Sequence, residues 1–362
     1  MFQVGSRGDG YLRSPADNYE AASGDPYLPP ELVQELELCG GAEFAGWAIP
    51  AAGGQGPAWV ERAETVGRVA PDVWKKRTPF GKLVAEDPSV RIRLEHASDE
   101  ISTRVVDLMT PIGRGQRCLI VAPPKAGKTV LLQKIAAAVT ANHPDIHLIV
   151  LLVDERPEEV TDMRRTVQGE VVASSSDEQV ENHVRVCEMV MERAKSLVET
   201  NHDVIILMDS ITRMSRAYNN QQKGSGRVLS GGIDARTMEK PRKFFGAARN
   251  VVDGGSLTVI GTALVDTGSR MDEVIFQEFK GTGNTEVVMD RGLFEKRIFP
   301  AIDIAASGTR KEEKLFTPQE HQQVTLLRRA LASSRAAEAM QLLVDRLGKY
   351  KTNAEFLKGL RG

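Results

Sequence analysis

The chain has 362 residues, 41% of them hydrophobic and 27% charged, with a formal net charge of −2. These values are ordinary for a globular protein of about two domains, and they argue against a chain that coats nucleic acid throughout. No apolar run approaches the ~18 residues of a membrane span, no N-terminal segment has the order of a secretory signal, and three scattered cysteines argue against a disulfide framework or a zinc site. We therefore expect a cytoplasmic protein without a membrane partner.

The first part of the chain is predicted to be a small all-β domain. Residues 1–68 are rich in glycine, proline and alanine, and apolar and polar residues alternate over 44–49 and 59–63. This pattern is typical of a barrel of short strands. Residues 69–98 contain three prolines and a basic cluster at 75–77, which favours a connector.

From residue 99 to residue 362 the pattern becomes an alternation of strands and helices. The strands are predicted at 118–122, 147–154, 204–209, 257–263, 286–290 and 302–305. Helical periodicity covers 179–199, 235–250, 318–348 and 353–360, with Asn353 as an N-cap of the last helix. Near-continuous apolar strands indicate a mainly parallel sheet covered on both faces, so ligands are expected at the carboxyl ends of the strands.

A phosphate-binding loop is predicted at residues 121–129, which read VAPPKAGKT between a strand and a helix. Backbone N–H groups in such a loop curl around phosphate at a helix N-terminus. Gly127 allows close approach, Lys128 reaches the terminal phosphates, and the Thr129 hydroxyl can bind Mg²⁺. Ala122 stands where a first glycine is usual, which weakens the motif slightly.

Carboxylates follow the next two predicted strands. Asp209 ends an apolar strand and can hold Mg²⁺ through water. The alternative is a helix N-cap or turn residue, but Ser210 would serve equally well there, so the phosphate loop favours the metal role. Asp154 and Glu155 end the preceding strand, and either could be the general base that activates water. The residues alone do not choose between them.

Charge is distributed unevenly along the chain. Residues 14–65 carry nine acids and one base, whereas residues 210–250 carry nine bases and two acids. Glycine-containing basic loops at 223–236 and 266–270 could line a channel that tracks a single strand, or could be ordinary solvated loops. Arg310 follows a glycine in a loop that could project it toward a transition state, but a solvated arginine is the commoner outcome.

Several long runs carry a resemblance to the bacterial transcription termination factor Rho family. They are PIGRGQR at 111–117, the phosphate loop, DERPEEV at 154–160, MDSITR at 208–213, EFKGTGN at 278–284 and SGTRKEE at 307–313. The resemblance implies a RecA-like phosphate-loop motor preceded by an OB (cold-shock-like) barrel. It also implies a homohexameric ring that hydrolyses ATP, moves 5′ to 3′ along single-stranded RNA and terminates transcription, with RNA polymerase and elongation factors left open as partners.

The resemblance also implies roles in hydrolysis. Glu155 would be the base, Asp209 a metal ligand, Arg310 a finger reaching a neighbour's site and Arg156 a group near the γ-phosphate, in addition to Lys128. ATP would be the nucleotide, Thr129 and Asp209 would hold Mg²⁺, and Phe299 would pack against adenine. The other positions implied to contact nucleotide are Gly113, Arg114, Gly115, Gln116, Arg117, Cys118, Lys125, Ala126, Gly127 and Val130.

Two loops match the family's RNA-gripping loops: Val228, Leu229, Ser230, Gly231 and Gly232 form the first, and Thr267, Gly268, Ser269 and Arg270 the second. Arg270 stands where lysine is familiar, which keeps the charge but changes the geometry of a contact.

The barrel departs more from the family pattern. Its implied RNA-binding positions are Gly8, Asp9, Gly10, Tyr11, Leu12, Arg13, Asp25, Tyr27 and Trp59. Tyr11 keeps one stacking ring of a G-F-G-F-L-R strand, whereas Asp9 replaces the other. Each stacked base contributes ~1–3 kcal/mol, so a lost ring and an acidic domain predict weak or altered RNA binding.

Two other functions are compatible with parts of the pattern. A rotary-type ATPase subunit shares the motor fold and an N-terminal barrel, but the two basic loops favour an RNA motor. A non-catalytic RNA-binding protein is disfavoured, because Lys128, Thr129, Glu155, Asp209 and Arg310 each serve a different step of hydrolysis.

Overall fold

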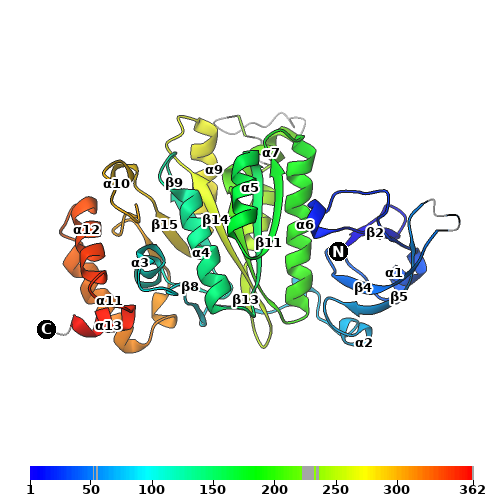
Figure 1. Cartoon of the computed structure of the whole chain (residues 1–362), viewed down its shortest axis with the longest axis horizontal. Helices are drawn as coiled ribbons and strands as arrows, with labels where there is room; N and C mark the ends of the chain where they lie inside the picture. Colours follow the sequence, from blue (N-terminus) through cyan, green and yellow to red (C-terminus); the bar gives the residue numbers. More distant parts are fainter. Residues whose placement is uncertain (52, 54–55, 222–231, 234–235, 361–362) are drawn as a thin grey trace.

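The computed structural model describes residues 1–51, 53, 56–221, 232–233 and 236–360 (Figure 1). A small strand-rich part at the N-terminus lies beside a larger α/β body, and helices at the C-terminus lie on the opposite side of that body. No helix within these residues is long and apolar enough to cross a membrane.

The N-terminal part is a sheet that closes on itself. Its strands run in the order β1-β2-β3-β5-β4 and comprise β1 Phe2–Val4, β2 Gly10–Leu12, β3 Tyr27–Leu28, β4 Phe44–Ile49 and β5 Trp59–Val66. The Phe2 N–H donates to the Ala42 carbonyl at 2.8 Å and the Gly41 N–H to the Phe2 carbonyl at 3.0 Å, which returns β1 to the chain entering β4. This order and closure agree with the expected OB barrel.

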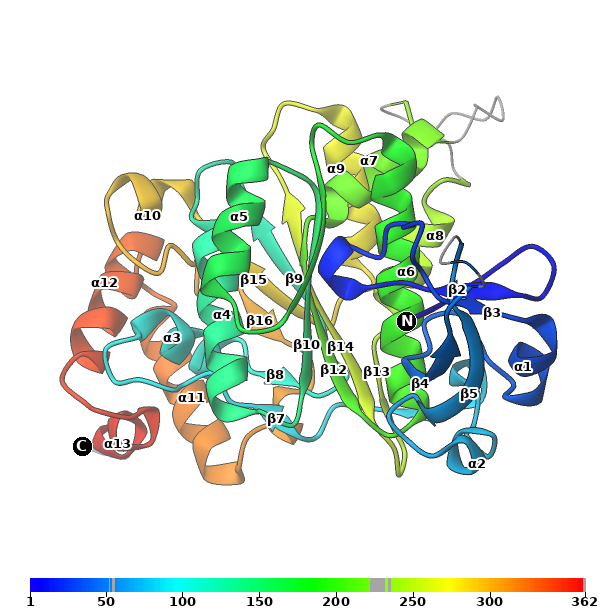
Figure 2. The ribbon, with the colours of Figure 1, turned by 45° about the vertical axis from the view of Figure 1, so that its right-hand side comes forward.

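Residues 69–98, the expected connector, contribute to both the barrel and the α/β body. It contains α2 Pro71–Trp74, the 3₁₀ turn Phe80–Lys82, β6 Ala85–Glu86 and β7 Arg91–Ile92. Trp74 is buried in the barrel core, and the Arg77 guanidinium lies 3.6 Å from the centre of its ring. Arg77 also pairs at 2.8 Å with Glu199 at the end of α6 Val180–Glu199, the helix beside the barrel, so this segment fastens the barrel to the body (Figure 2).

The body contains the mainly parallel sheet that the sequence predicts. Its main order is β11-β10-β12-β14-β9-β15-β16, and only β16 pairs antiparallel along this path. The bounds are β9 Arg117–Ala122, β10 His147–Glu155, β11 Glu170–Ser175, β12 Asp203–Asp209, β14 Ser256–Leu264, β15 Thr285–Val288 and β16 Gly308–Thr309. β13 Arg249–Val251 pairs antiparallel with β14 and with β6, whereas β8 Ile112–Gly113 forms a separate two-stranded sheet with β7.

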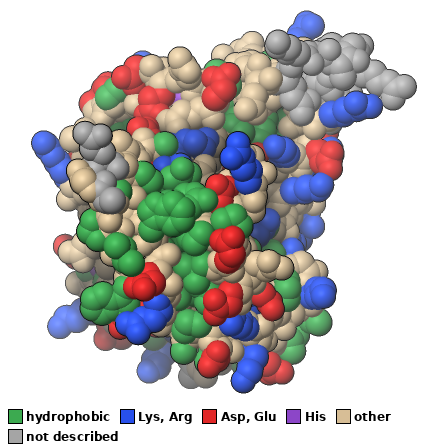
Figure 3. All heavy atoms as spheres, turned by 90° about the vertical axis from the view of Figure 1, so that its right-hand side faces the viewer, with side chains coloured by type: hydrophobic (Ala, Val, Ile, Leu, Met, Phe, Trp, Pro, Cys, Tyr) green, Lys and Arg blue, Asp and Glu red, His purple; other side chains and the backbone are tan. Residues whose placement is uncertain are grey.

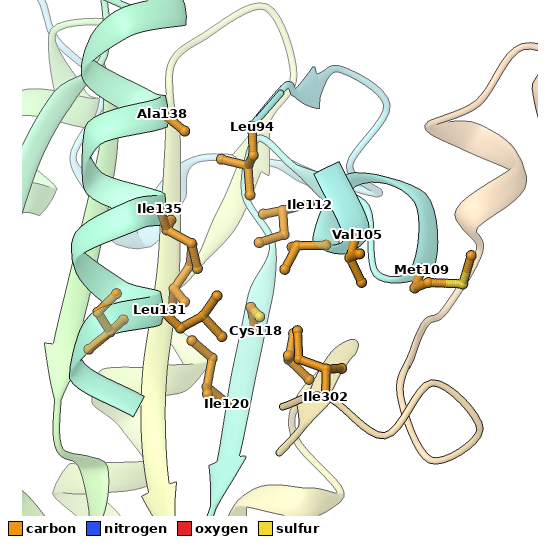
Figure 4. Close-up of a cluster of buried hydrophobic side chains, with 14 of the residues drawn as sticks. Leu94, Val105, Met109, Ile112, Cys118, Ile120, Leu131, Ile135, Ala138 and Ile302 are labelled. Carbon is orange, nitrogen blue, oxygen red and sulfur yellow. The ribbon is translucent and has the colours of Figure 1, made fainter. Parts of the chain in front are cut away.

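Both faces of this sheet are covered by helices, because its strands are apolar on both sides. In β10, Leu148, Val150 and Leu152 enter one hydrophobic cluster, whereas Ile149, Leu151 and Val153 enter the other. The first cluster lies under α3 Ile101–Met109, α4 Lys128–Asn142 and α5 Pro157–Thr166, and Figure 4 shows part of it. The second lies under α6 Val180–Glu199, α7 Ile211–Gln221, α8 Glu239–Gly246 and α9 Arg270–Lys280.

The remaining helices are short or terminal. They are α1 Pro30–Glu35, α10 Arg291–Glu295, α11 Pro318–Leu331, α12 Ala336–Leu347 and α13 Asn353–Gly359, with further 3₁₀ turns at Pro15–Asp17 and Glu312–Lys314.

Three expectations about secondary structure are wrong. Residues 302–305 form a single bridge at Ile302 rather than a strand, because Asp303 accepts the Ala305 and Ala306 N–H groups and turns the chain. Helix 235–250 is only α8, since residues 249 and 250 pair with β14 instead. The N-cap of α13 is Thr352, which accepts the Glu355 N–H at 3.1 Å, whereas Asn353 bonds to Arg104.

Candidate functional site

The phosphate loop has the backbone that its sequence requires. It joins the end of β9 to the start of α4, and Lys125 and Gly127 both have positive φ, 62° and 88°. Ala122 is the last residue of β9, is buried and pairs with Leu264 of β14. A strand residue needs no glycine, which explains why alanine is tolerated there.

Two carboxylates converge on the loop lysine from neighbouring strands. The Lys128 ammonium donates to Asp209 Oδ2 and lies 3.8 Å from Glu155 Oε2. The Thr262 hydroxyl donates to Asp209 Oδ1 at 2.8 Å and fixes that carboxylate. The carboxyl ends of β9, β10, β12 and β14 therefore build one polar site, as expected for a parallel sheet.

The oxygen ligands at this site suit a hard cation such as Mg²⁺. Thr129 lies at the first turn of α4, and its hydroxyl is 3.4 Å from Glu159 Oε2. The Asp209 carboxylate forms an ion pair with the Lys128 ammonium at this site. No group of three or more His, Cys, Asp or Glu side chains that could hold a metal occurs among the described residues. A metal here would thus depend on Thr129, Asp209 and substrate phosphate together.

The geometry distinguishes Glu155 from Asp154. Glu155 is only 3% exposed, and its Oε2 atom has no hydrogen-bond partner among the described residues. Burial raises the pKa of its carboxyl and the Asp209 charge adds to the rise, whereas Lys128 and Arg213 oppose it. Asp154 is partly exposed and pairs with Arg213 at 3.1 Å. A buried carboxylate with a free oxygen and a raised pKa is the better candidate base.

A largely apolar cavity of about 360 Å³ opens beside the phosphate loop. Phe299 is 46% exposed at this cavity, and its ring meets the ring of Phe294 edge-on at 5.5 Å. The other lining residues are Ser102, Ala126, Gly127, Val130, Leu131, Lys134, Met289, Pro300 and Ala301. The sequence analysis did not identify Phe294 as a residue of this cavity. The signal that could have found it is its position just before Phe299, on the short helix α10.

Replacing Phe299 with alanine is expected to weaken ATP binding about tenfold, because a base stacked on an aromatic ring contributes ~1–3 kcal/mol. Competition with a fluorescent nucleotide measures this. Val252→Ala changes an exposed apolar side chain that does not line the cavity, and it should bind like wild type. Unchanged affinity in Phe299→Ala would contradict the assignment.

The run Gly113–Cys118 lies away from this cavity. It runs from the last residue of β8, Gly113, to the second residue of β9, Cys118, whereas the phosphate loop follows the carboxyl end of β9. Arg114 pairs with Asp203 and with Asp145, and Arg117 donates to the Thr282 carbonyl at 2.9 Å. Gln116 is buried and donates to Thr285 at 2.8 Å. The structure therefore does not bring this run to the nucleotide site of its own subunit. Its side chains make their contacts near the amino ends of the strands, opposite the phosphate loop.

Arg310 is also remote from its own phosphate loop. It is exposed after the edge strand β16, whose Thr309 is in register with Thr285 and, through it, with Cys118 near the start of β9. Within the described part of the chain the Arg310 side chain has no ion pair or hydrogen bond. Arg156, by contrast, directly follows Glu155 and is exposed.

Helix α7 joins the nucleotide site to the second candidate RNA loop. Near its start, Arg213 lies 3.4 Å from Glu155 Oε1. One turn later, Arg216 donates twice to buried Asp272, at 2.8 and 2.6 Å. Asp272 also accepts the Thr267 hydroxyl at 2.6 Å. Of the second loop, Gly268 and Ser269 lead into α9, and Arg270 is the first residue of that helix. Of the first loop, Gly232 is described and positions 228–231 lie outside the described residues.

The barrel brings three candidate rings together. Tyr11 pairs in register with Tyr27, and Tyr27 with Trp59; their ring centres are 5.4 and 4.9 Å apart. Asp9 accepts the Tyr27 hydroxyl at 3.3 Å, and Arg13 pairs with Asp25.

The other predicted RNA-binding positions in and before β2 shape the backbone or pack against the barrel core. Gly8 has a φ of 80°, and a side chain at Gly10 would collide with the Gln3 carbonyl and the Phe2 ring. Leu12 packs against the barrel core.

Comparisons with known proteins agree with this architecture. Residues 102–309 match the nucleotide-binding domain of the ATP synthase alpha/beta family. The chain is 52% identical to transcription termination factor Rho of Aquifex aeolicus, over 99% of this chain and 84% of that protein. It is 49% identical to transcription termination factor Rho of Borreliella burgdorferi, over 99% and 70% respectively.

Solved structures share the fold at low identity. A prototypical ATPase from the type III secretion system of pathogenic bacteria superposes with a TM-score of 0.64 at 21% identity, over 78% of this chain and 89% of that one. An ATP synthase subunit of Nanoarcheaum equitans gives 0.62 at 16%, over 76% and 77%.

Proposed function

We propose, from the premise that this chain belongs to the transcription termination factor Rho family, that it is an RNA-dependent ATPase that moves 5′ to 3′ along single-stranded RNA as a homohexameric ring. Its motor belongs to the ATP synthase alpha/beta nucleotide-binding family. Action on nascent RNA places it in the cytoplasm, next to RNA polymerase and elongation factors.

One observation carries the proposal: the groups needed for hydrolysis lie on two separate surfaces of one chain. Lys128, Asp209 and Glu155 meet at the carboxyl ends of the strands, whereas Arg310 is exposed beyond the far edge strand. A complete site therefore requires a second copy that supplies Arg310. Repetition of such a head-to-tail contact generates a ring when the rotation closes.

Each group has a defined task in the proposed reaction. The phosphate loop and Lys128 bind the β- and γ-phosphates, and Phe299 packs against adenine. Mg²⁺ held by Thr129 and Asp209 would neutralise phosphate charge. Glu155 accepts a proton from the water that attacks the γ-phosphorus, which releases ADP and phosphate. Arg156 and a neighbour's Arg310 stabilise the charge on the transferred phosphoryl group.

Contacts along α7 support coupling between hydrolysis and RNA movement. A shift of Glu155 on nucleotide turnover acts on Arg213, and the same helix carries Arg216 against Asp272 at the second loop. Residues 228–232 and 267–270 would grip RNA in the ring, with the barrel as the loading site. Asp9 stands where a second stacking ring is expected, and the barrel is acidic. Both features favour weaker RNA binding by the part of the barrel that carries Tyr11, Tyr27 and Trp59.

The ATPase rate with and without single-stranded RNA tests the proposed function, with single-stranded DNA as the control. We expect RNA to stimulate turnover at least tenfold and DNA to leave it near the basal rate. A rate indifferent to RNA would contradict the proposal and favour the rotary-type ATPase, which has the same motor fold.

A further inference from the structure

The outer face of the barrel exposes large apolar side chains that the three candidate rings do not account for. Trp47 is 59% exposed and Ile49 54%, both on β4, and Ile49 is paired with the candidate ring Trp59 on β5, which is 54% exposed. Figure 3 shows hydrophobic side chains gathered on the barrel side of the molecule. Contiguous exposed apolar surface of this kind marks a binding site more often than chance does.

The strand register makes these residues a continuation of the ring row. Tyr11, Tyr27 and Trp59 pair across β2, β3 and β5, and Trp59 pairs in turn with Ile49 on β4. Directly opposed residues share a face of a sheet, so the four side chains form one row across four strands. Trp47 lies two residues before Ile49 and therefore on the same face of β4.

Trp47 has a charged partner suited to a nucleic acid. Pairing skips Glu61, so a bulge separates the Trp47–Arg62 pair from the Ile49–Trp59 pair. The Arg62 guanidinium lies 5.9 Å from the Trp47 ring centre, and Arg62 makes no ion pair with another described residue. At the other end of the row the Arg13 guanidinium lies 5.0 Å from the Tyr11 ring centre. Flat rings beside guanidinium groups are the usual platform for unpaired bases.

We propose that Trp47 and Ile49 form an additional base-binding subsite for single-stranded nucleic acid on β4, with Arg62 contacting the adjoining phosphate. The inference rests on the proposed RNA-binding role of the barrel and extends it. The ring lost at Asp9 is replaced at the opposite end of the row, so the bound strand is shifted toward β4. Continuity with the ring row favours bases over a protein partner at this surface.

Fluorescence of the assembled full-length protein tests the subsite directly. In a Trp59→Phe background only Trp47 remains exposed, because Trp74 is fully buried. Oligocytidine and oligouridine long enough to span the row should quench this fluorescence, whereas oligomers of two nucleotides should quench it less. Absence of quenching by the long oligomers, while they bind the protein, would overturn the proposal.

Measurements of affinity for the long oligomers are a second test, and they distinguish the subsite from the motor function. Trp47→Ala should lower affinity for the long oligomers about tenfold, and Trp47→Phe should restore most of it. Val4→Ala, an equally exposed residue on β1 outside the row, should bind like wild type. Wild-type affinity in Trp47→Ala would overturn the subsite and favour a protein partner, even where RNA still stimulates ATPase. Loss of affinity without RNA-stimulated ATPase would retain the subsite and reject the motor.

Discussion

Replacement of Glu155 with glutamine is expected to lower ATP turnover by ~10²- to 10⁴-fold, the usual contribution of a general base. The amide has nearly the shape of the carboxyl group but cannot accept the proton of the attacking water. Lys128, Asp209 and Phe299 remain in place, so ATP binding should be retained. Single-turnover hydrolysis and equilibrium nucleotide binding, measured on the same preparation, separate these two effects.

Glu158→Gln is the matched control for this variant. Glu158 is exposed in the first turn of α5 and has no described contact with the phosphate loop, so its loss should leave turnover unchanged. Normal turnover in the Glu155→Gln variant would show that Glu155 is not the general base.

The pH dependence of ATP turnover in the wild-type protein also tests whether Glu155 is the base. The base acts as a carboxylate, and burial together with the Asp209 charge raises the pKa of Glu155. Turnover should therefore fall as pH decreases through a value above the ordinary pKa of glutamate, about 4.3. The Glu155→Gln variant should not show this fall in turnover as pH decreases.

Replacement of Arg310 with alanine is expected to lower hydrolysis by ~10³-fold or more, as for other arginine fingers. Its exposed position away from its own phosphate loop means that ATP affinity should change little. Steady-state kinetics with RNA present measure the loss. Arg329→Ala removes another exposed arginine, on α11, and should behave like wild type. A small effect in Arg310→Ala would exclude the finger.

Local pattern was sufficient to predict the elements that form the nucleotide site. The apolar strands that end at Ala122 and Asp209 lie where their hydrophobic runs end, because strands buried on both faces must be apolar throughout. The choice between Asp154 and Glu155 could not be made in this way. It depends on contacts with Arg213 and Asp209, which come from distant parts of the chain.

The missed features all depend on tertiary pairing. Residues 249–251 look helical in sequence but form β13, because the first residues of β14, before its pairing with β9 begins, offer hydrogen bonds. Trp47 reads as an alternating strand residue, and only the register with β5 places it beside the ring row. The nucleotide contacts that the resemblance implies for residues 113–118 stay a prediction, and the structure places these residues between the end of β8 and the start of β9.

Mixing two inactive variants measures the central claim, that one site is shared by two copies. Lys128→Ala disables the phosphate site but keeps Arg310, whereas Arg310→Ala keeps the phosphate site. Each alone should show almost no RNA-stimulated ATPase. Co-assembled rings should recover activity well above either, since some junctions combine an intact loop with an intact arginine. Activity of the mixture that stays at the level of the separate variants would contradict a site built between subunits.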